Sequence, residues 1–440
     1  MKRISYLKIT SWALYSLLLI GLGSCQKAEF MPPPVGEELP APAYKSLIEA
    51  LPEQASLFKT AWQKAEMETI VITELGQAKT TFLVPNNTAM EAAGFTAAKI
   101  QTADKASLQK VLRYHVLNGN ISIEQLKVAG VDLIFTTLLK HPKYLEGELK
   151  DRTLFRDVPY GYRHQLNTRD GKLVINGKPV AVDKELDVAQ GKAFLVDKVF
   201  IAPEDQMYDF LVKDGRFSLF LKAMELNNVE YENELALNWF VNFFPPMRYL
   251  TDWNYYFPSG FHSRPDRPRH IIRFTLFAPT DAAFQALGIN NTADLESLNS
   301  RIPTPYYYDQ DQRTPIDSLL RYHQTARPRA GSDFDDEYLE YSYNVQVGQE
   351  INAIDFYTNM LNDKILSNYM IQSYTGSGNW IYRYPEHRFN RTGDKIKVGH
   401  INSKDQNATI IEEDINTIQG PVHVVDRIIV PKDFSMWHKK

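Results

Sequence analysis

Two Arg-Tyr-His tripeptides hold the residues of this chain that are best suited to chemistry. They are Arg113-Tyr114-His115 and Arg321-Tyr322-His323. A histidine can serve as a general base near neutral pH, but it needs a nucleophile or acid partner and an open site. Neither tripeptide is accompanied by a serine elbow, a paired-carboxylate motif or a cysteine nucleophile. We therefore expect no catalytic residue and no enzyme; Tyr114, His115, Tyr322 and His323 should be structural, with the histidines hydrogen-bonded and the tyrosines in the core.

The other polar clusters do not indicate a metal or cofactor site. The acidic run Asp333-Phe-Asp335-Asp336-Glu337 offers carboxylate oxygens, but its spacing is not that of an EF-hand, and acidic runs commonly face solvent. The ten histidines include no His-Glu-x-x-His spacing for zinc. Gly376-Ser-Gly378 is too short a glycine motif to predict a phosphate cradle. We expect no metal and no cofactor.

A long aromatic segment from Tyr231 to His270 offers a different kind of site. It is punctuated by prolines and arginines. Planar rings with polar neighbours suit sugar rings, and they equally suit the hot spots of protein interfaces. Alternatively, these rings bury themselves over the core of the second half of the chain or between its two halves. The candidate ligand-binding residues are Trp239, Trp253, Tyr255, Tyr256, Phe257 and Phe261.

The N-terminus has the pattern of an export signal. Lys2, Arg3 and Lys8 precede an apolar run from Trp12 to Leu22, which is short for a membrane span. The run ends in Leu22-Gly23-Ser24-Cys25, which resembles the lipobox of bacterial lipoproteins, and Cys25 is the only cysteine of the sequence. We expect residues 1–24 to be removed and Cys25 to be diacylated; the alternative is an ordinary secretory signal beside a chance cysteine.

Residues 25–43 predict a proline-rich tether, because Met31-Pro32-Pro33-Pro34 and Pro40-Ala41-Pro42 favour extended chain over helix. The charged residues behind Cys25 resemble the surface-export signal of lipoproteins in the Bacteroidota. They place the expected protein on the outer face of the outer membrane, although a linker without an address would have a similar composition. Removal of the signal leaves 46 basic and 53 acidic groups, a net charge of −7. That charge argues against a nucleic-acid partner.

The elements that must position these residues occur twice. Thr81-Phe-Leu-Val-Pro-Asn-Asn-Thr-Ala-Met90 returns as Thr275-Leu-Phe-Ala-Pro-Thr-Asp-Ala-Ala-Phe284, and Ser56-Leu57-Phe58 returns as Ser218-Leu219-Phe220. Each copy predicts a strand that ends at a proline, then a helix capped by Asn86 or Thr280 and stopped by a glycine. Each closes on a strand-like segment, Phe194–Pro203 and His423–Pro431. Alternating helices and strands with a β-rich tail predict an α+β fold.

These motifs resemble the fasciclin domain, an extracellular module with a β-sandwich wedge flanked by a helical bundle. The two Thr-Pro segments are similar to its first signature, the Tyr-His pairs to its second, and the closing Val-Asp-Lys/Arg strands to its last. The resemblance covers residues 44–203 and 206–432, with the aromatic insert at 231–270 in the second domain. In the family the Tyr-His pair is implicated in adhesion. Three ordered signatures found twice indicate tandem domains.

The lipobox at Cys25 and the resemblance to the fasciclin domain together predict a non-catalytic, lipid-anchored protein of the outer membrane that adheres to or binds an extracellular glycan or protein. The alternative is an accessory subunit of a starch-utilisation-type glycan transport complex, docked on a transporter by its inserts. An exposed and grooved aromatic insert would favour glycan binding, whereas a flat apolar one would favour docking.

Overall fold

The computed structural model describes two consecutive repeats of helices and strands. The described residues are 44–146, 158–237, 254–255, 269–271, 273–299, 315–325, 341–344, 349–351, 355–366, 369–375, 379–383, 387–400 and 408–430. The helices and strands formed by these described residues lie in the compact unit Lys45–Lys440. The predicted signal, Cys25 and the tether lie outside the described residues. Repeat one denotes residues 44–203 below, and repeat two denotes residues 206–430.

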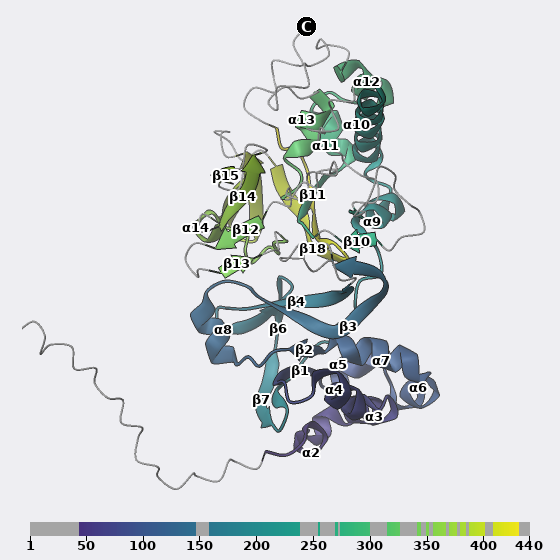
Figure 1. The fold of residues 1–440 in the computed structure, drawn as a ribbon, viewed down its shortest axis with the longest axis vertical. Coiled ribbons are helices and arrows are strands. Elements are labelled where there is room, and N and C mark those ends of the chain that lie inside the picture. The colour runs from purple at the N-terminus through teal and green to yellow at the C-terminus, as the bar shows by residue number, and fades with distance from the viewer. Residues whose placement is uncertain are drawn as a thin grey trace, which may run out of the picture. The chain divides into compact units, whose positions relative to one another are not determined.

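Repeat one opens with short helices that pack against the first strands of its sheet (Figure 1). Ser46 and Glu49 form a capping box at the start of the first helix, and Pro52 follows its end. Phe58 and Trp62 are buried on one face of the next long helix. The helices are α2 (Leu47–Ala50), the 3-10 turn η1 (Glu53–Ala55), α3 (Ser56–Lys64), α4 (Met67–Leu75), α5 (Asn87–Ala92), α6 (Ala97–Thr102), α7 (Lys105–Tyr114) and α8 (Ile123–Ala129).

The strands of repeat one form a continuous sheet in the order β6-β5-β4-β3-β2-β1-β8-β7. The pair β1 and β8, next to the edge strand β7, is parallel, with Thr80 opposite Gly191 and Pro85 opposite Val196, and the other neighbours in this order are antiparallel. The strands are β1 (Thr80–Pro85), β2 (Val116–Asn118), β3 (Leu133–Glu146), β4 (Pro159–Arg169), β5 (Lys172–Ile175), β6 (Lys178–Val180), β7 (Val182–Val188) and β8 (Gly191–Val196).

Repeat two contains a five-stranded sheet, β11-β19-β18-β17-β16, and a four-stranded sheet, β13-β12-β14-β15. Its helices α10 to α13 gather beside β11 (Figure 1). The helices are α9 (Met207–Asp214), α10 (Ser218–Leu237), α11 (Asp281–Ala286), α12 (Thr292–Asn299), α13 (Pro315–Arg321) and α14 (Asp363–Leu366). The strands are β9 (Asn254–Tyr255), β10 (Arg269–Ile271), β11 (Leu276–Pro279), β12 (Tyr341–Asn344), β13 (Gln349–Ile351), β14 (Tyr369–Thr375), β15 (Asn379–Arg383), β16 (His387–Thr392), β17 (Lys395–His400), β18 (Ala408–Thr417) and β19 (Gly420–Val425). The mixed composition of both repeats confirms the predicted α+β fold.

Repeated sequence motifs make the same local contacts in both copies. In repeat one the side chain of Asn87 accepts a hydrogen bond from Leu57 N–H (3.0 Å) and donates one to Ser56 Oγ (3.0 Å). In repeat two Asp281 accepts from Leu219 N–H (2.7 Å) and from Ser218 Oγ (2.7 Å). The first turn of α5 or α11 is therefore bonded to the start of α3 or α10, so the Ser-Leu-Phe motif fixes one helix against another.

The closing strands end earlier than the sequence predicts. β8 ends at Val196 and β19 at Val425. The next residue in each case, Asp197 or Asp426, keeps one backbone hydrogen bond, from its N–H to Ala181 O or Thr409 O. The carboxylate of Asp197 accepts a hydrogen bond from Ala181 N–H, and that of Asp426 accepts one from Thr409 N–H. The carboxylate thus takes the place of the backbone carbonyl as the acceptor of one of the two hydrogen bonds of the pair at this point.

The segment 231–270 contains more regular structure than a long loop. Helix α10 continues through Tyr231 to Leu237, and no proline or glycine interrupts its sequence. At the other end β10 pairs in parallel with β3 of repeat one, with Arg269 opposite Tyr144 and Ile271 opposite Glu146. The end of the insert therefore extends the sheet of the other repeat.

The two repeats share a small apolar cluster besides their separate cores. It joins Tyr114, Leu139, Tyr160, Tyr162 and Ala202 of repeat one to Ile271 and Ile418 of repeat two. We call the set of contacts between the repeats the junction.

Candidate functional site

The histidine of each Arg-Tyr-His tripeptide is buried at the end of a helix and makes the same two hydrogen bonds. His115 is 1% exposed and His323 is fully buried. His115 Nδ1 donates to Val111 O (2.9 Å), and Phe200 N–H donates to His115 Nε2 (3.0 Å). His323 Nδ1 donates to Leu319 O (2.7 Å), and Ile429 N–H donates to His323 Nε2 (3.1 Å). Each imidazole thus bonds the end of a helix to the chain that follows the closing strand.

These partners determine the protonation state of both rings. A carbonyl oxygen can only accept and a backbone N–H can only donate, so Nδ1 carries the proton and Nε2 accepts. Burial lowers the pKa of His115 to about 4 and that of His323 to about 3. Both rings are therefore neutral near pH 7, and both nitrogens are already engaged within the protein.

A second histidine in each repeat, outside the predicted site residues, donates a hydrogen bond to the backbone carbonyl of the tripeptide tyrosine. His164 Nε2 on β4 donates to Tyr114 O (3.1 Å), and its ring centroid lies 4.1 Å from that of Tyr114. His387 Nε2 on β16 donates to Tyr322 O (2.7 Å). Burial lowers the pKa of His164 to about 3. Tyr114 is 2% exposed, whereas Tyr322 is only half-buried.

None of these bonds joins a histidine of the tripeptides to a hydroxyl, thiol or carboxylate that it could activate. Within the described ranges, no group of three or more His, Cys, Asp or Glu side chains could hold a metal ion. The acidic run Asp333–Glu337 and the Gly376–Gly378 segment lie outside these ranges.

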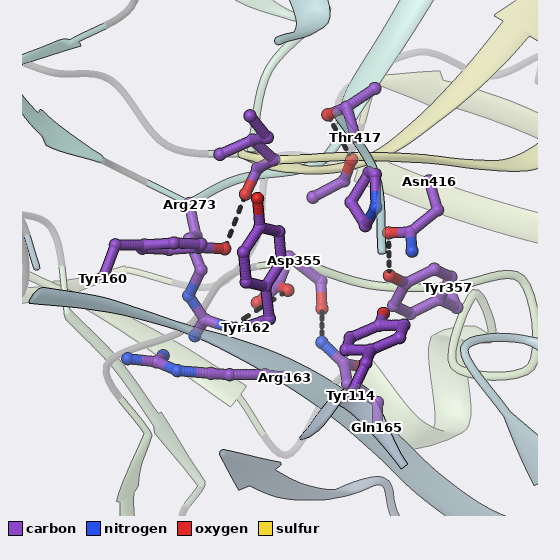
Figure 2. A pocket seen from close by; sticks show the side chains of 13 residues that line it. Tyr114, Tyr160, Tyr162, Arg163, Gln165, Arg273, Asp355, Tyr357, Asn416 and Thr417 are labelled. Atoms are coloured by element: carbon purple, nitrogen blue, oxygen red, sulfur yellow. Dashed lines mark hydrogen bonds and ion pairs between the residues drawn. The ribbon is translucent and has the colours of Figure 1, made fainter. Parts of the chain in front are cut away.

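A small polar cavity lies at the junction (Figure 2). Tyr160 OH donates to Ile418 O (2.6 Å) and Gln165 Nε2 donates to Asp355 O (2.9 Å), so both bonds cross from repeat one to repeat two. Arg273 Nη1 lies 3.4 Å from Asp355 Oδ2. The lining residues are Tyr114, Tyr160, Tyr162, Arg163, Gln165, Pro203, Arg273, Asp355, Tyr357, Asn416, Thr417, Ile418 and Gly420.

This cavity is suited to holding the repeats together and not to catalysis. Its volume is about 20 Å³, which is space for about one water molecule. Burial raises the pKa of Tyr114 and of Tyr160, so both phenols stay neutral hydrogen-bonding groups. The lining contains no histidine, serine or cysteine. A substrate larger than a water molecule would not fit in this space.

Comparison with known proteins identifies the fold. The model of the fasciclin domain matches residues 53–202 and 267–431, which include both tripeptides and most of both repeats. The chain belongs to the fasciclin domain family. It is similar to the fasciclin domain pair of the insect cell adhesion molecule fasciclin I, with 12% identity over 87% of this chain and 99% of that one, at a TM-score of 0.29. No curated protein matches the sequence.

The tandem fasciclin architecture supports a binding or adhesion role without catalysis. The candidate ligand-binding residues Trp239, Trp253, Tyr256, Phe257 and Phe261 lie outside the described residues. Tyr255 lies in β9, whose backbone pairs with β10. Their role therefore stays a prediction from the sequence.

Proposed function

We propose that this fasciclin-domain protein is a lipid-anchored protein of the outer cell surface that binds an extracellular glycan or protein without catalysis. The observation that carries the proposal is the pair of matched fasciclin domains, because such domains occur in adhesion proteins. The buried neutral histidines support it, since their ring nitrogens are engaged in bonds within the domain. Among the described residues no helix is long and apolar enough to cross a bilayer.

The anchor is tested at Cys25. We expect Cys25→Ala to move the protein from the membrane to the soluble fraction, because a lipid-modified cysteine would be the attachment point. The test is to extract cells that express each form with detergent and to measure how the protein divides between the detergent phase and the aqueous phase. The control is Ala28→Ser in the tether, which should leave the partitioning of the protein unchanged. If Cys25→Ala still partitions into detergent after the signal is cleaved, the protein is held by something other than this lipid.

The recognition surface is tested at the insert. We expect Trp253→Ala and Tyr256→Ala each to weaken capture of the ligand on a glycan array or an extracellular-protein array by about 2 kcal/mol or more, as hot-spot rings do. The melting temperature should stay unchanged. The matched control is Tyr44→Ala, an exposed ring outside the insert.

Ligand capture and the melting temperature also test the alternative, in which the rings of the insert are buried in a core of their own. If the insert rings form a private core, the same changes should destabilise the protein by about 3–5 kcal/mol per large ring. A variant that keeps both its melting temperature and its ligand would remove the insert from the proposal.

A further inference from the structure

Asp132 of repeat one is buried against repeat two. It lies between α8 and β3, and it is 6% exposed. Asn359 Nδ2 of repeat two donates to Asp132 Oδ1 (2.5 Å), and the backbone N–H of Asp132 points at Met360 Sδ (3.4 Å). The second carboxylate oxygen, Oδ2, is buried and has no hydrogen-bond partner among the described residues. Oδ1 of Asp132 thus accepts a hydrogen bond from the other repeat, and Oδ2 accepts none among the described residues.

The charged groups that face Asp132 do not compensate its charge. Asp414 on β18 and Asp355, which precedes α14, both repel the charge of Asp132. Asn167 on β4 and Asn359 are neutral amides. Arg273 pairs with Asp355. His423 accepts a hydrogen bond from Asp414 N–H through Nδ1, and burial lowers its pKa, so it adds no positive charge near neutral pH.

An ionised carboxylate is costly in such a place, because a buried charge needs an opposite charge or several donors. A proton on Oδ2 removes the charge while Oδ1 keeps its bond from Asn359. In agreement with this geometry, burial, with added repulsion from Asp414 and Asp355, raises the pKa of Asp132 to about 7 despite the bond from Asn359 and the nearby amide of Asn167. Burial raises the pKa of Asp355 as well, and its Oδ1 has no hydrogen-bond partner among the described residues, but Asp355 has Arg273 as a charged partner and Asp132 has none.

We propose that the junction of the two fasciclin repeats binds one proton at Asp132, so that the repeats are held together more tightly in mildly acidic than in alkaline solution. Where the repeats separate, Asp132 meets water and returns to the ordinary aspartate pKa of 3.8. The packed state then holds a proton that the separated state has lost. This contribution is fully present below pH 3.8 and is lost as the pH rises through about 7.

The packing equilibrium should therefore weaken about tenfold between pH 6 and pH 8, as the linkage relation requires for a group of this kind. The experiment uses the mature chain with Cys25→Ala. Hydrogen exchange is followed at the amide of Ile418, which lies at the junction and donates to Asp205 O, after division by the intrinsic exchange rate. Amides of β1 inside repeat one serve as the internal reference.

We expect protection at Ile418 to fall about tenfold from pH 6 to pH 8 while β1 stays constant. Asp132→Asn, which is a neutral mimic of the protonated acid, should abolish this fall. Asp394→Asn, at an exposed turn, should retain it. A carboxyl NMR titration of Asp132 in the unmutated protein gives an answer even if the variant folds poorly. A titration near pH 4, or equal pH dependence in Asp132→Asn and the unmutated protein, would overturn the proposal.

Discussion

A single methyl group added at Gly191 or at Gly420 should destabilise the protein by about 2–5 kcal/mol, through backbone strain and overpacking together. Gly191 begins β8 with φ +144°, and a Cβ there would lie 2.1 Å from Thr80 O. Gly420 begins β19 with φ +130°, and a Cβ there would lie 2.5 Å from Phe274 O. In both repeats the added Cβ would collide with the backbone of an adjacent segment of the same polypeptide. Backbone atoms there cannot rotate away as the end of a side chain can.

Two other glycines provide matched controls. Gly171 in the β4–β5 turn and Gly393 in the β16–β17 turn also have positive φ, but an added Cβ would meet nothing within 4 Å. Gly171→Ala and Gly393→Ala should therefore cost only the conformational penalty, about 1–2 kcal/mol. Urea denaturation gives the free energy of unfolding of all four alanine variants. The difference between the two pairs is the cost of the steric clash, apart from backbone strain. If Gly191→Ala unfolds at the same urea concentration as Gly171→Ala, the close approach of β1 and β8 is not what requires glycine.

The parts of the fold that the sequence predicts are those set by local chemistry. Pro85 and Pro279 end the strands β1 and β11, and Asn86 and Thr280 accept hydrogen bonds from the third residue beyond them, as helix caps do. These signals need only a few neighbouring residues, and their repetition identifies two domains. The Ser-Leu-Phe motif is repeated in the sequence, and the structure shows that its two copies are bonded in the same way, to Asn87 and to Asp281.

The bonds that complete the site depend on distant segments, and most have no local signal. That Phe200 N–H and Ile429 N–H reach the tripeptide histidines follows from the path of the chain after β8 and β19. Asp132 belongs to no motif, and its burial depends on how repeat two packs against it. His164 and His387 do have a signal, because each begins a His-x-x-Asn motif that precedes a glycine turn, and comparison of the copies would have revealed it.

Loss of either tripeptide histidine should lower the free energy of unfolding by about 1–3 kcal/mol near pH 7, because its two backbone partners would be left buried without a bond. We expect this of His323→Ala, and of His115→Ala in the other repeat. Glu91→Ala, at an exposed position of α5, is the control and should change little. Loss of binding with an unchanged melting temperature would instead make the histidine a contact residue for the ligand.

Acid should remove the advantage of these histidines. Their folded pKa values of about 4 and 3 lie below the ordinary 6.5, so the unfolded chain binds more protons, and each ring contributes stability that is lost as the pH falls below 6.5. The slope is up to about 1.4 kcal/mol per pH unit for each ring. Asp132, Asp355 and Glu413 act in the opposite direction, because their pKa values are raised, whereas His141, His164 and His423 act in the same direction as the tripeptide rings.

A protonated histidine ring would also lose one of its two hydrogen bonds. A proton on Nε2 would face the N–H of Phe200 or Ile429, so a donor would meet a donor at the point where the helix holds the chain that follows the closing strand. The difference between the unmutated protein and His323→Ala should therefore shrink as urea denaturation is repeated from pH 7 down to pH 4. A difference that stays constant over this range would show that His323 stabilises the domain by packing alone, without the two hydrogen bonds that require a neutral ring.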